Sequence, residues 1–415
     1  MPTVDPARFN ALSVHLGGRR IGVINRLAGE HQIFAFDQDY VDDPRRPTLS
    51  LSFKGRTRGI VTSLRPVTVR VPPFFSNLLP EGHMRTYLAK QAGVKPEREF
   101  YLLAALGEDL AGAVTVVPLE GDGREEESDI HPEEPQDDVL HFSLAGVQLK
   151  FSAVAESCGG LTIPVHGVGG SWIVKLPSTQ FAHVPENEYA MLELARAVGI
   201  DVPAIQLIAM DEIHGLPPDM IRLQGKALAV ERFDRTPEGD RIHMEDFAQV
   251  FGVYPHDKYD GRSYANIAAV LWAETGPDGA YEFVRRLVFS VLIGNGDMHL
   301  KNWSLLYPGG RTPVLSPAYD LVATRFYIPG DSLALSFGDS RSLDTITLDQ
   351  VRRFSDTAGL PMKPVWDLVR ETVERTTTAW KGLAQKDVLP GEMRDAIGRQ
   401  IESAAISEGR RARRV

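Results

Sequence analysis

The stretch Gly294-Asn-Gly-Asp-Met-His-Leu-Lys-Asn302 is the part of the chain that says most about its fold. The residues before it, Tyr281–Ile293, are apolar on nearly every face after Arg286, which predicts a buried helix. A short apolar strand is expected at Trp303–Tyr307, followed by a Pro-Gly-Gly turn and a return strand at 312–315. Polar residues would therefore lie at both ends of a small hairpin that rests on a buried helix.

Three polar side chains around this hairpin are of the types that phosphoryl transfer requires. Asp297 and Asn302 are five residues apart, and Asp320 follows the return strand. In such reactions one carboxylate orients the attacking hydroxyl, while an amide oxygen and a second carboxylate hold Mg²⁺ on the phosphates. A turn whose Asn and Asp side chains only cap the backbone is the alternative. The buried helix and the hairpin favour phosphoryl transfer, and His299 within the loop could be structural or functional.

A nucleotide site also needs a cation for the phosphates, and Lys175 is a candidate. It lies in the apolar strand expected at Ser171–Leu176, where a buried ammonium group needs a partner. The next helix, expected over Pro185–Val198 and ended by Gly199, carries Glu188 within its apolar arc. An inward lysine and an inward glutamate form the ion pair found in kinases. A strand-edge lysine and a first-turn glutamate favoured by the helix dipole would give the same spacing.

Other site types find little support. Neither of the glycine-rich phosphate-loop patterns occurs, and Ser143-Leu-Ala-Gly-Val-Gln-Leu-Lys150 predicts only a tight turn between two strands, with a hydroxyl and a lysine. The 11 histidines are scattered without a paired spacing, which argues against a histidine-built metal centre. The single cysteine, Cys158, excludes an internal disulfide framework and a metal site of the CxxC type.

Length and composition set the number of units and the compartment. The chain has 415 residues, of which 43% are hydrophobic and 24% charged, so we expect two or three packed units rather than disorder. The longest strongly apolar run, about Leu287–Ile293, is far shorter than the roughly 20 residues of a membrane-spanning helix. Met1–Asn10 has no apolar core of a signal peptide. With the single cysteine, this favours the cytoplasm.

The net charge of −10 is concentrated in one segment. Ten carboxylates and Arg124 lie between Leu119 and Asp138, so that segment carries −9 and the rest of the chain is nearly neutral. Its glycines and prolines are typical of a solvated tether. Four arginines at 410–414 suggest a frayed basic tail that could touch DNA phosphates only within a complex. Any DNA contact is therefore expected through a partner.

The pattern along the chain predicts an α+β protein of two lobes behind an N-terminal unit. Residues 1–119 are expected to form a β-rich subdomain, 120–138 an acidic linker, 139–235 a small lobe and 236–415 a helical lobe with the 294–302 loop. In the first unit we expect a hairpin of 20–25 with 31–37, alternating stretches at 48–53 and 67–71, helices at 81–91 and 98–106, and a strand at 113–118. In the small lobe we expect strands at 139–143, 148–154, 161–165, 171–176, 205–210 and 227–232.

In this order, the motifs resemble the HipA-type serine/threonine kinases, the toxins of type II toxin–antitoxin pairs. The resemblance covers nearly the whole chain and implies a protein-kinase-like core with a mostly α-helical C-terminal lobe. In the N-terminal unit it rests on Asn77-Leu-Leu-Pro-Glu81 and Gly112-Ala-Val-Thr115. In the kinase part it rests on Ser143–Lys150, Trp172–Pro177, Asn187–Tyr189, Val230–Arg235, His243–Phe247, Asp297–Asn302 and Tyr319-Asp320.

The resemblance implies Mg²⁺ and ATP as cofactors and a role for each motif. Asp297 would be the catalytic aspartate, and Asn302 and Asp320 would hold Mg²⁺. Lys175, paired with Glu188, would contact the ATP phosphates. Further nucleotide contacts would come from the ATP loop (Ala145, Gly146, Val147, Gln148 and Lys150), from a hinge offering backbone hydrogen bonds to adenine (Glu231, Arg232 and Phe233), and from His299, Lys301 and Tyr319.

The resemblance also implies regulation and partners. Ser143 would be autophosphorylated and thereby inactivate the kinase, since a phosphoserine adds close to two negative charges beside the phosphate pocket. The substrate would be an aminoacyl-tRNA synthetase, best known in the family as the glutamyl enzyme, so that translation stops and persistence follows. The partner would be a HipB-like helix-turn-helix antitoxin dimer whose complex represses its own promoter.

Three departures and two alternatives accompany this interpretation. Leu149 stands where the familiar member has glutamate, Met244 where it commonly has glutamine, and Gly294-Asn-Gly replaces a different lead-in to the aspartate. Leu149 and Met244 could alter nucleotide affinity or substrate choice. One alternative is a small-molecule phosphotransferase of the aminoglycoside or choline kinase kind, which shares a similar catalytic loop. The other is a catalytically quiet corepressor, against which the intact Lys175, Asp297, Asn302 and Asp320 argue.

Overall fold

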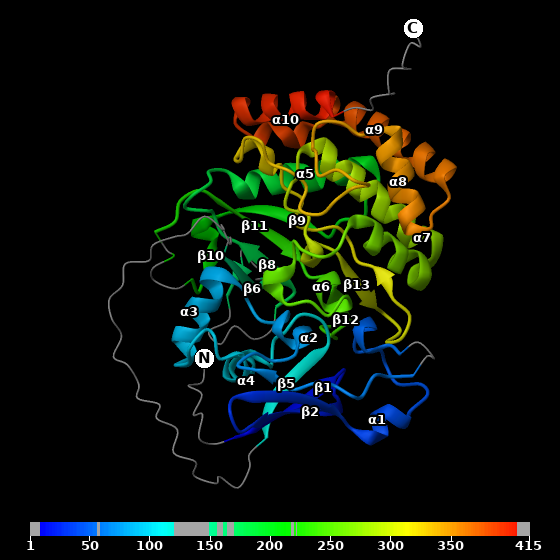
Figure 1. Ribbon diagram of the computed structural model, residues 1–415. Coiled ribbons are helices and arrows are strands. Elements are labelled where there is room, and N and C mark those ends of the chain that lie inside the picture. Colours follow the sequence, from blue (N-terminus) through cyan, green and yellow to red (C-terminus); the bar gives the residue numbers. More distant parts are fainter. Residues whose placement is uncertain are drawn as a thin grey trace.

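The computed structural model describes residues 9–55, 59–119, 149–155, 161–163, 170–216, 220 and 222–404. Within these ranges the chain forms three sheets, each packed against helices, and Figure 1 shows them stacked from the N-terminal unit at the bottom to α5 and α7–α10 at the top. The predicted α+β fold with a mostly helical C-terminal lobe is confirmed. None of the helices in these ranges is both long enough and apolar enough to cross a membrane.

The N-terminal unit is a five-stranded antiparallel sheet in the order β4-β3-β2-β1-β5. One sheet face turns buried side chains such as Leu12, Ile24 and Phe34 to a core shared with short helices. The predicted hairpin is present, with Ile24 paired to Phe34. The strands are β1 (Ala11–Leu16), β2 (Arg19–Leu27), β3 (His31–Phe36), β4 (Val67–Thr68) and β5 (Val114–Leu119), and the helices are α1 (Gln38–Asp42), α2 (Pro73–Ser76), α3 (Gly82–Ala92) and α4 (Glu99–Leu106).

The alternating stretch at 48–53 does not form a strand, contrary to what its pattern suggests. Leu51–Phe53 is a 3-10 helix, and the Ser50 side chain caps it by accepting from the Ser52 N–H. A carboxylate of the helical lobe, Glu245, accepts from both the Ser50 hydroxyl and the Leu51 N–H. These contacts, made 194 and 195 residues away in sequence, override the local β pattern.

The small lobe is a six-stranded sheet in the order β10-β7-β6-β8-β11-β9, covered by α5. The helix spans Val184–Val198, with Pro185 at its second position rather than its first, and Gly199 closes it at φ +91°, a conformation that glycine adopts without strain. The strands are β6 (Lys150–Ala155), β7 (Leu161–Thr162), β8 (Trp172–Lys175), β9 (Ile205–Ala209), β10 (Ile213–His214) and β11 (Lys226–Glu231). The strand expected at 139–143 lies outside the described residues.

The helical lobe is organised around α7 (Tyr264–Ile293), which is broken at Gly276, where φ is +73° before Pro277. Its second half is buried as predicted and leads directly into the 294–302 loop. The loop continues into a three-stranded sheet of β12 (His243–Asp246), β13 (Ser304–Tyr307) and β14 (Val314–Leu315), in which β13 is central. The predicted hairpin is β13–β14. The other helices are α6 (Phe247–Val250), α8 (Leu348–Ala358), α9 (Met362–Gly382) and α10 (Gly391–Ser403).

Glu245 on β12 is a fully buried carboxyl group at the junction of the N-terminal unit and the helical lobe. It accepts from Ser50, from the Leu51 N–H and from the Tyr307 hydroxyl at 2.5 Å. Burial raises its pKa from 4.5 to about 7, although these three donors oppose the shift. A carboxyl group with a raised folded pKa stabilises the fold below its unfolded pKa, and this contribution is lost as the pH rises through the folded pKa.

We therefore expect Glu245→Gln to gain stability relative to the wild type as the pH rises from about 5 to 8. At roughly 1.4 kcal/mol per pKa unit, the difference between the two free energies of unfolding should shift by about 2–3 kcal/mol in favour of the variant. The glutamine can still accept from Tyr307 and Leu51 and can donate to Ser50. Urea unfolding of both proteins across this pH range measures the shift, and parallel pH dependences would contradict it.

Candidate active site

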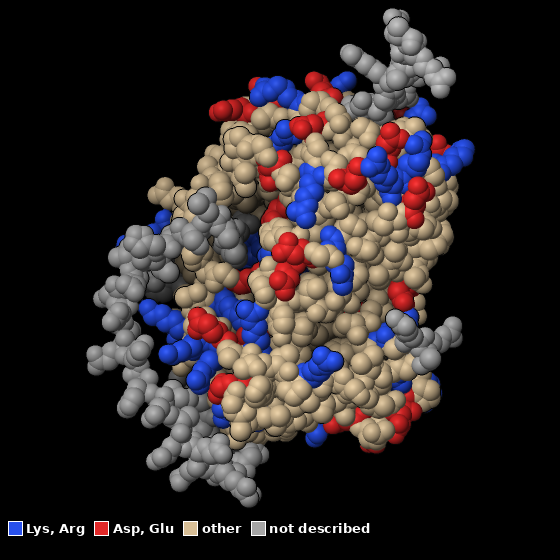
Figure 2. Space-filling model, in the orientation of Figure 1, with Lys and Arg blue, Asp and Glu red and all other residues tan. Residues whose placement is uncertain are grey.

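A cavity of about 1950 Å³ lies where the N-terminal unit, the small lobe and the helical lobe meet. On the face shown in Figure 2, basic and acidic side chains are intermixed, and side chains of both signs border the hollow left of centre. The cavity is lined from all three parts, for example by Glu81 of the N-terminal unit, Lys175 of β8 and Asp297 of the loop. The predicted catalytic loop and the predicted phosphate lysine thus face one space.

Asp297 is held in place by its own loop and by one tyrosine. Its N–H donates to Asn295 Oδ1 at 3.1 Å, and its carbonyl accepts from Asn302 Nδ2 at 3.0 Å. The Tyr259 hydroxyl donates to Asp297 Oδ1 at 2.7 Å. Burial raises the pKa of Asp297, and the Tyr259 hydrogen bond opposes that shift. The carboxylate stays accessible from the cavity, as a group that orients a substrate hydroxyl must.

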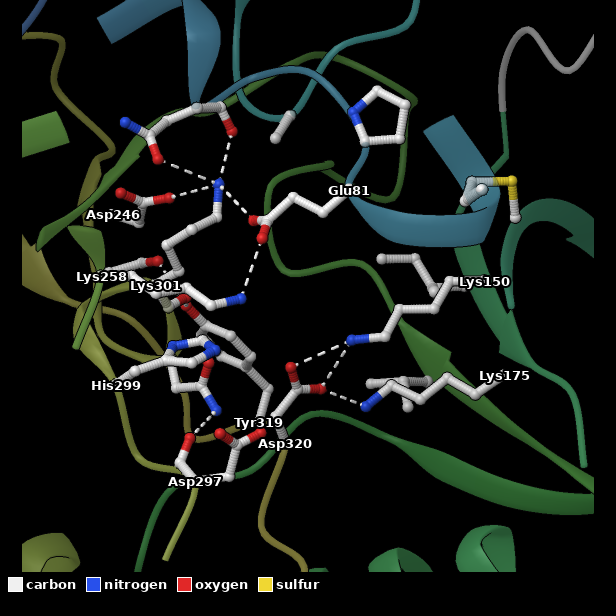
Figure 3. Close-up of a pocket in the computed structure, with 18 of the residues that line it drawn as sticks. Glu81, Lys150, Lys175, Asp246, Lys258, Asp297, His299, Lys301, Tyr319 and Asp320 are labelled. Atoms are coloured by element: carbon white, nitrogen blue, oxygen red, sulfur yellow. Dashed lines mark hydrogen bonds and ion pairs between the residues drawn. The ribbon is translucent and has the colours of Figure 1, made fainter. Parts of the chain in front are cut away.

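Asp320 lies beside Asp297, as Figure 3 shows, and is reached through the β13–β14 hairpin. Its backbone has φ +55°, a conformation that non-glycine residues adopt infrequently. Two contacts fix this turn: Asn295 Nδ2 donates to the Asp320 carbonyl at 3.4 Å, and the Ala323 N–H donates to Asn187 of α5 at 2.9 Å. The turn therefore aims the Asp320 carboxylate into the cavity from a strained but well-supported backbone.

Two lysines of the small lobe converge on that carboxylate. Lys175 contacts both Glu188 and Asp320, and Lys150 lies 3.0 Å from Asp320 Oδ2. Lys175 and Glu188 are only 4% and 1% exposed, so the inward pair expected from the apolar arc of α5 is present. Burial lowers the pKa of Lys175, but the negative charges of Asp320 and Glu188 outweigh burial, so the pKa of Lys175 is raised overall. Burial raises the pKa of Asp320, but the positive charges of Lys150 and Lys175 outweigh burial and hold the pKa of Asp320 well below its usual range.

The predicted metal ligands fit Mg²⁺ by their chemistry. The Asn302 amide nitrogen is committed to the Asp297 carbonyl, which leaves the amide oxygen as the ligand atom. Asp320 supplies an ionised carboxylate. Within the described part of the chain no three His, Cys, Asp or Glu side chains gather into a metal cage. One amide oxygen and one carboxylate suit Mg²⁺, which commonly binds one or two carboxylates and takes its other ligands from water and substrate phosphates.

The other loop residues named for the nucleotide are placed differently. Lys301 lines the cavity, but its ammonium group is bound to Asn77 O at 2.8 Å and lies 3.3 Å from Glu81 and 3.5 Å from Asp246. His299 is 7% exposed, and burial lowers its pKa to about 3, so it is neutral. Both residues remain predicted nucleotide contacts, and Lys301 does not join Lys150 and Lys175 at Asp320.

Tyr319 and the predicted hinge also line the cavity. The Tyr319 hydroxyl donates to Lys301 O at 2.9 Å, and its ring lies 5.6 Å from that of Phe233. The N–H groups of Glu231 and Arg232 donate to Ala204 O and Ser171 O, so the sheet already uses them. Among these three residues Phe233 alone keeps an N–H for which the described residues show no acceptor.

The Arg232 side chain is also committed within the protein. It donates to Asp234 at 2.9 Å through two nitrogens and to Ser152 Oγ at 3.0 Å. Asp234 in turn accepts from the Gly112 N–H at 2.8 Å, which ties the segment to the N-terminal unit. Within the predicted hinge, the guanidinium group of Arg232 therefore stabilises the junction rather than pointing to a base. Ser143 and the ATP-loop residues Ala145, Gly146, Val147 and Gln148 lie outside the described residues.

Several charged and polar groups around Asp297 were not singled out from the sequence. Lys258 and Tyr259 lie in the turn that follows the 3-10 helix Pro255–Asp257, and Glu81 precedes α3 in the N-terminal unit. Lys258 lies 2.9 Å from Glu81, and the Tyr259 ring packs against His299 with centroids 5.1 Å apart. The only signal in the sequence was the Asn77–Glu81 motif, since the other two residues stand in no recognisable spacing to the loop.

Replacing Tyr259 by phenylalanine should shift the acid side of the pH–rate profile upward and lower the rate about tenfold, since a hydrogen bond to a charged group contributes roughly 1.5–3 kcal/mol. The hydroxyl donates to Asp297 Oδ1 and lowers the pKa of that carboxyl, so its loss leaves burial less opposed. More Asp297 is then protonated at mildly acid pH. Initial rates of phosphate transfer from pH 5 to 9 measure this, and an unchanged acid limb would contradict the assignment.

Two family models match the chain in succession. Residues 12–117 match the model described as the HipA N-terminal domain, and residues 142–380 match that of the HipA-like C-terminal domain. The chain is 53% identical over 386 residues to Y4dM of Sinorhizobium fredii, named as a candidate kinase, a match that covers 92% of this chain and 94% of the relative.

A toxin and a solved structure from Shewanella oneidensis are also similar. The serine/threonine-protein kinase toxin HipA of that organism is 27% identical over 401 residues, with 86% of each chain covered. A chain in the structure of the Shewanella oneidensis HipA–HipB–operator DNA complex superposes with a TM-score of 0.72 at 24% identity, covering 95% of this chain and 97% of that chain. At that identity the structural match shows a shared fold.

Proposed function

The chain belongs to the HipA family, and on this premise we propose that it is an ATP-dependent serine/threonine protein kinase. One observation carries the proposal: Asp297, Asn302 and Asp320 line one cavity together with Lys150 and the Lys175–Glu188 pair, and both lysines contact Asp320. This is the set that phosphoryl transfer needs, with an aspartate for the hydroxyl, two oxygen ligands for the metal and cations for the phosphates.

Bound Mg²⁺-ATP would supply the transferable phosphoryl group and neutralise part of its charge. Asn302 and Asp320 would hold the metal, and Lys150 and Lys175, which contact Asp320, would supply the positive charge for the phosphates. Glu188 keeps Lys175 in place, because it is buried behind the lysine and cannot itself reach solvent. Asp297 accepts the proton of the substrate hydroxyl and orients its oxygen toward the phosphorus.

We further propose that the acceptor is an aminoacyl-tRNA synthetase, with the glutamyl enzyme as the first candidate, and that its phosphorylation stops translation. Family membership and similarity to a HipA toxin support this. Autophosphorylation of Ser143 would inactivate the kinase, since a phosphoserine adds close to two negative charges, which would compete with the ATP phosphates. A helix-turn-helix antitoxin of the HipB kind is the proposed partner, and it would make the contacts to DNA, as suggested by the related HipA–HipB–operator complex.

The test is a transfer assay with three kinds of acceptor. The purified chain is incubated with Mg²⁺ and γ-labelled ATP, either alone, with a mixture of aminoacyl-tRNA synthetases, or with aminoglycosides and choline. We expect one labelled synthetase and, in the chain itself, phosphoserine at position 143. Label on the small molecules instead would establish a small-molecule phosphotransferase, and no label on any acceptor would support a catalytically quiet corepressor.

A further inference from the structure

Glu81 is the one carboxylate of the N-terminal unit that bridges two lysines in the cavity, among the described residues. It stands immediately before α3, and its two oxygens are divided between the lysines. Oε2 lies 2.9 Å from Lys258 Nζ, and Oε1 lies 3.3 Å from Lys301 Nζ. Figure 3 shows the carboxylate between the two ammonium groups. Burial raises the pKa of Glu81, but the two lysines outweigh it and keep the group ionised.

Each of these lysines belongs to a segment that holds Asp297. Lys301 lies in the loop between Asp297 and Asn302, one residue before the proposed metal ligand. Lys258 precedes Tyr259, whose hydroxyl donates to Asp297 Oδ1 at 2.7 Å. The two segments also meet directly, because the Leu300 N–H donates to Lys258 O at 3.2 Å. Glu81 therefore forms ion pairs with both segments that contact Asp297, although these segments lie more than 170 residues after Glu81 in the sequence.

From this geometry we infer that Glu81 is a positioning residue for phosphate transfer: it acts through Lys258 and Lys301 to set the place of the Asp297 carboxylate. The inference rests on the proposed kinase function, and it means that the N-terminal unit helps to position the Asp297 carboxylate. Glu81 is 3.3 Å from a loop lysine but makes no described contact with Asp297, Asn302 or Asp320, so it does not act on the reacting atoms.

The expected defect lies in turnover rather than in nucleotide affinity. In the described part of the chain, Lys150, Lys175 and Glu188 of the small lobe make no hydrogen bond or ion pair with Glu81, so ATP binding should survive its loss. A displacement of the reacting groups by about 1 Å can lower a rate by about 100-fold. We expect Glu81→Gln to lower kcat by about 10- to 100-fold and to change KM for ATP by less than about threefold.

Glu274→Gln is the matched control. Glu274 also joins the helical lobe to the N-terminal unit, through an ion pair with Lys54 at 2.6 Å. Neither Glu274 nor Lys54 lines the cavity. Loss of Glu274 removes one carboxylate charge and one inter-unit ion pair, whereas Glu81→Gln removes one charge and two such pairs. Glu274→Gln touches neither segment around Asp297. Thermal unfolding midpoints of the two variants should agree within a few degrees, while only Glu81→Gln should lose kcat. Glu81→Asp keeps the charge and should recover part of it.

The outcomes separate the inference from the proposed function. If the wild type transfers phosphate and Glu81→Gln turns over as fast as Glu274→Gln, the inference is wrong and the kinase assignment stands. If the wild type transfers none, both fall. Should Glu81→Gln unfold, Lys258→Gln serves in its place, because it removes one arm of the bridge and leaves Lys301 bound to Asn77 and Asp246. A normal kcat in a folded Lys258→Gln protein would also overturn the inference.

Discussion

Replacing Asp297 by asparagine should lower the rate of phosphate transfer by about a thousandfold, within the 10²–10⁴ range of general base catalysis, while ATP still binds. The amide is of nearly the same size and can still accept from Tyr259, so the hydrogen bond of 2.7 Å need not be lost. It cannot take a proton from the substrate hydroxyl. The nucleotide lysines and the two proposed metal ligands are untouched by this change.

Two measurements on the same preparation check this prediction. Steady-state rates with the preferred acceptor give the loss of turnover, and calorimetric titration with Mg²⁺ and an ATP analogue gives the affinity, which should stay within about threefold of the wild type. A variant that retains more than about a tenth of the wild-type rate would contradict the role given to Asp297. A variant that no longer binds the nucleotide would instead make Asp297 part of the binding site.

Replacing Lys175 by methionine should abolish measurable transfer and destabilise the small lobe. The side chain is 5% exposed and contacts Glu188 and Asp320, so its loss leaves Glu188 buried without its cation. Breaking a buried ion pair from one side costs about 3–5 kcal/mol. Because an unpaired buried carboxyl group keeps its proton to higher pH, the destabilisation should grow as the pH rises above the ordinary pKa of glutamate, about 4.3.

Urea unfolding at pH 5 and pH 8 tests this, with Lys54→Met as the control. Lys54 is also a salt-bridged lysine, but its side chain is 46% exposed, so its replacement should cost little stability at either pH. The Lys175 variant should be less stable than the wild type at pH 8 by more than at pH 5. Equal losses at both pH values would mean that Glu188 does not depend on Lys175 for its charge.

The parts of the site that could be predicted are those governed by local periodicity. Glu188 lies within the apolar arc of its helix, which predicted an inward side chain, and the structure decides between the two alternatives by pairing it with Lys175. The buried half of α7 and the β13–β14 hairpin followed from apolar patterns in the same way, and together they brought Asp320 back to Asp297. In each case a period in the sequence determines which way a side chain faces.

The parts that could not be predicted depend on contacts between distant segments. Nothing in the spacing of Glu81, Lys258 and Lys301 indicates that the N-terminal unit reaches the catalytic loop, because ion pairs between segments 177 or more residues apart leave no periodic signal. The alternation at 48–53 pointed to a strand, but buried hydrogen bonds to Glu245 formed a 3-10 turn there. Strand β12, which supplies Glu245, was not predicted either, because it forms by pairing with β13, a strand that lies far along the chain.

The most direct test of the account is a crystal structure of the protein with Mg²⁺ and a non-hydrolysable ATP analogue. We predict that the phosphates contact Lys150 and Lys175, that the metal contacts Asn302 and Asp320, and that the terminal phosphate faces Asp297. A nucleotide bound elsewhere, or bound in this cavity with its phosphates directed away from Asp297, would contradict the central claim that this cavity is a phosphate-transfer site.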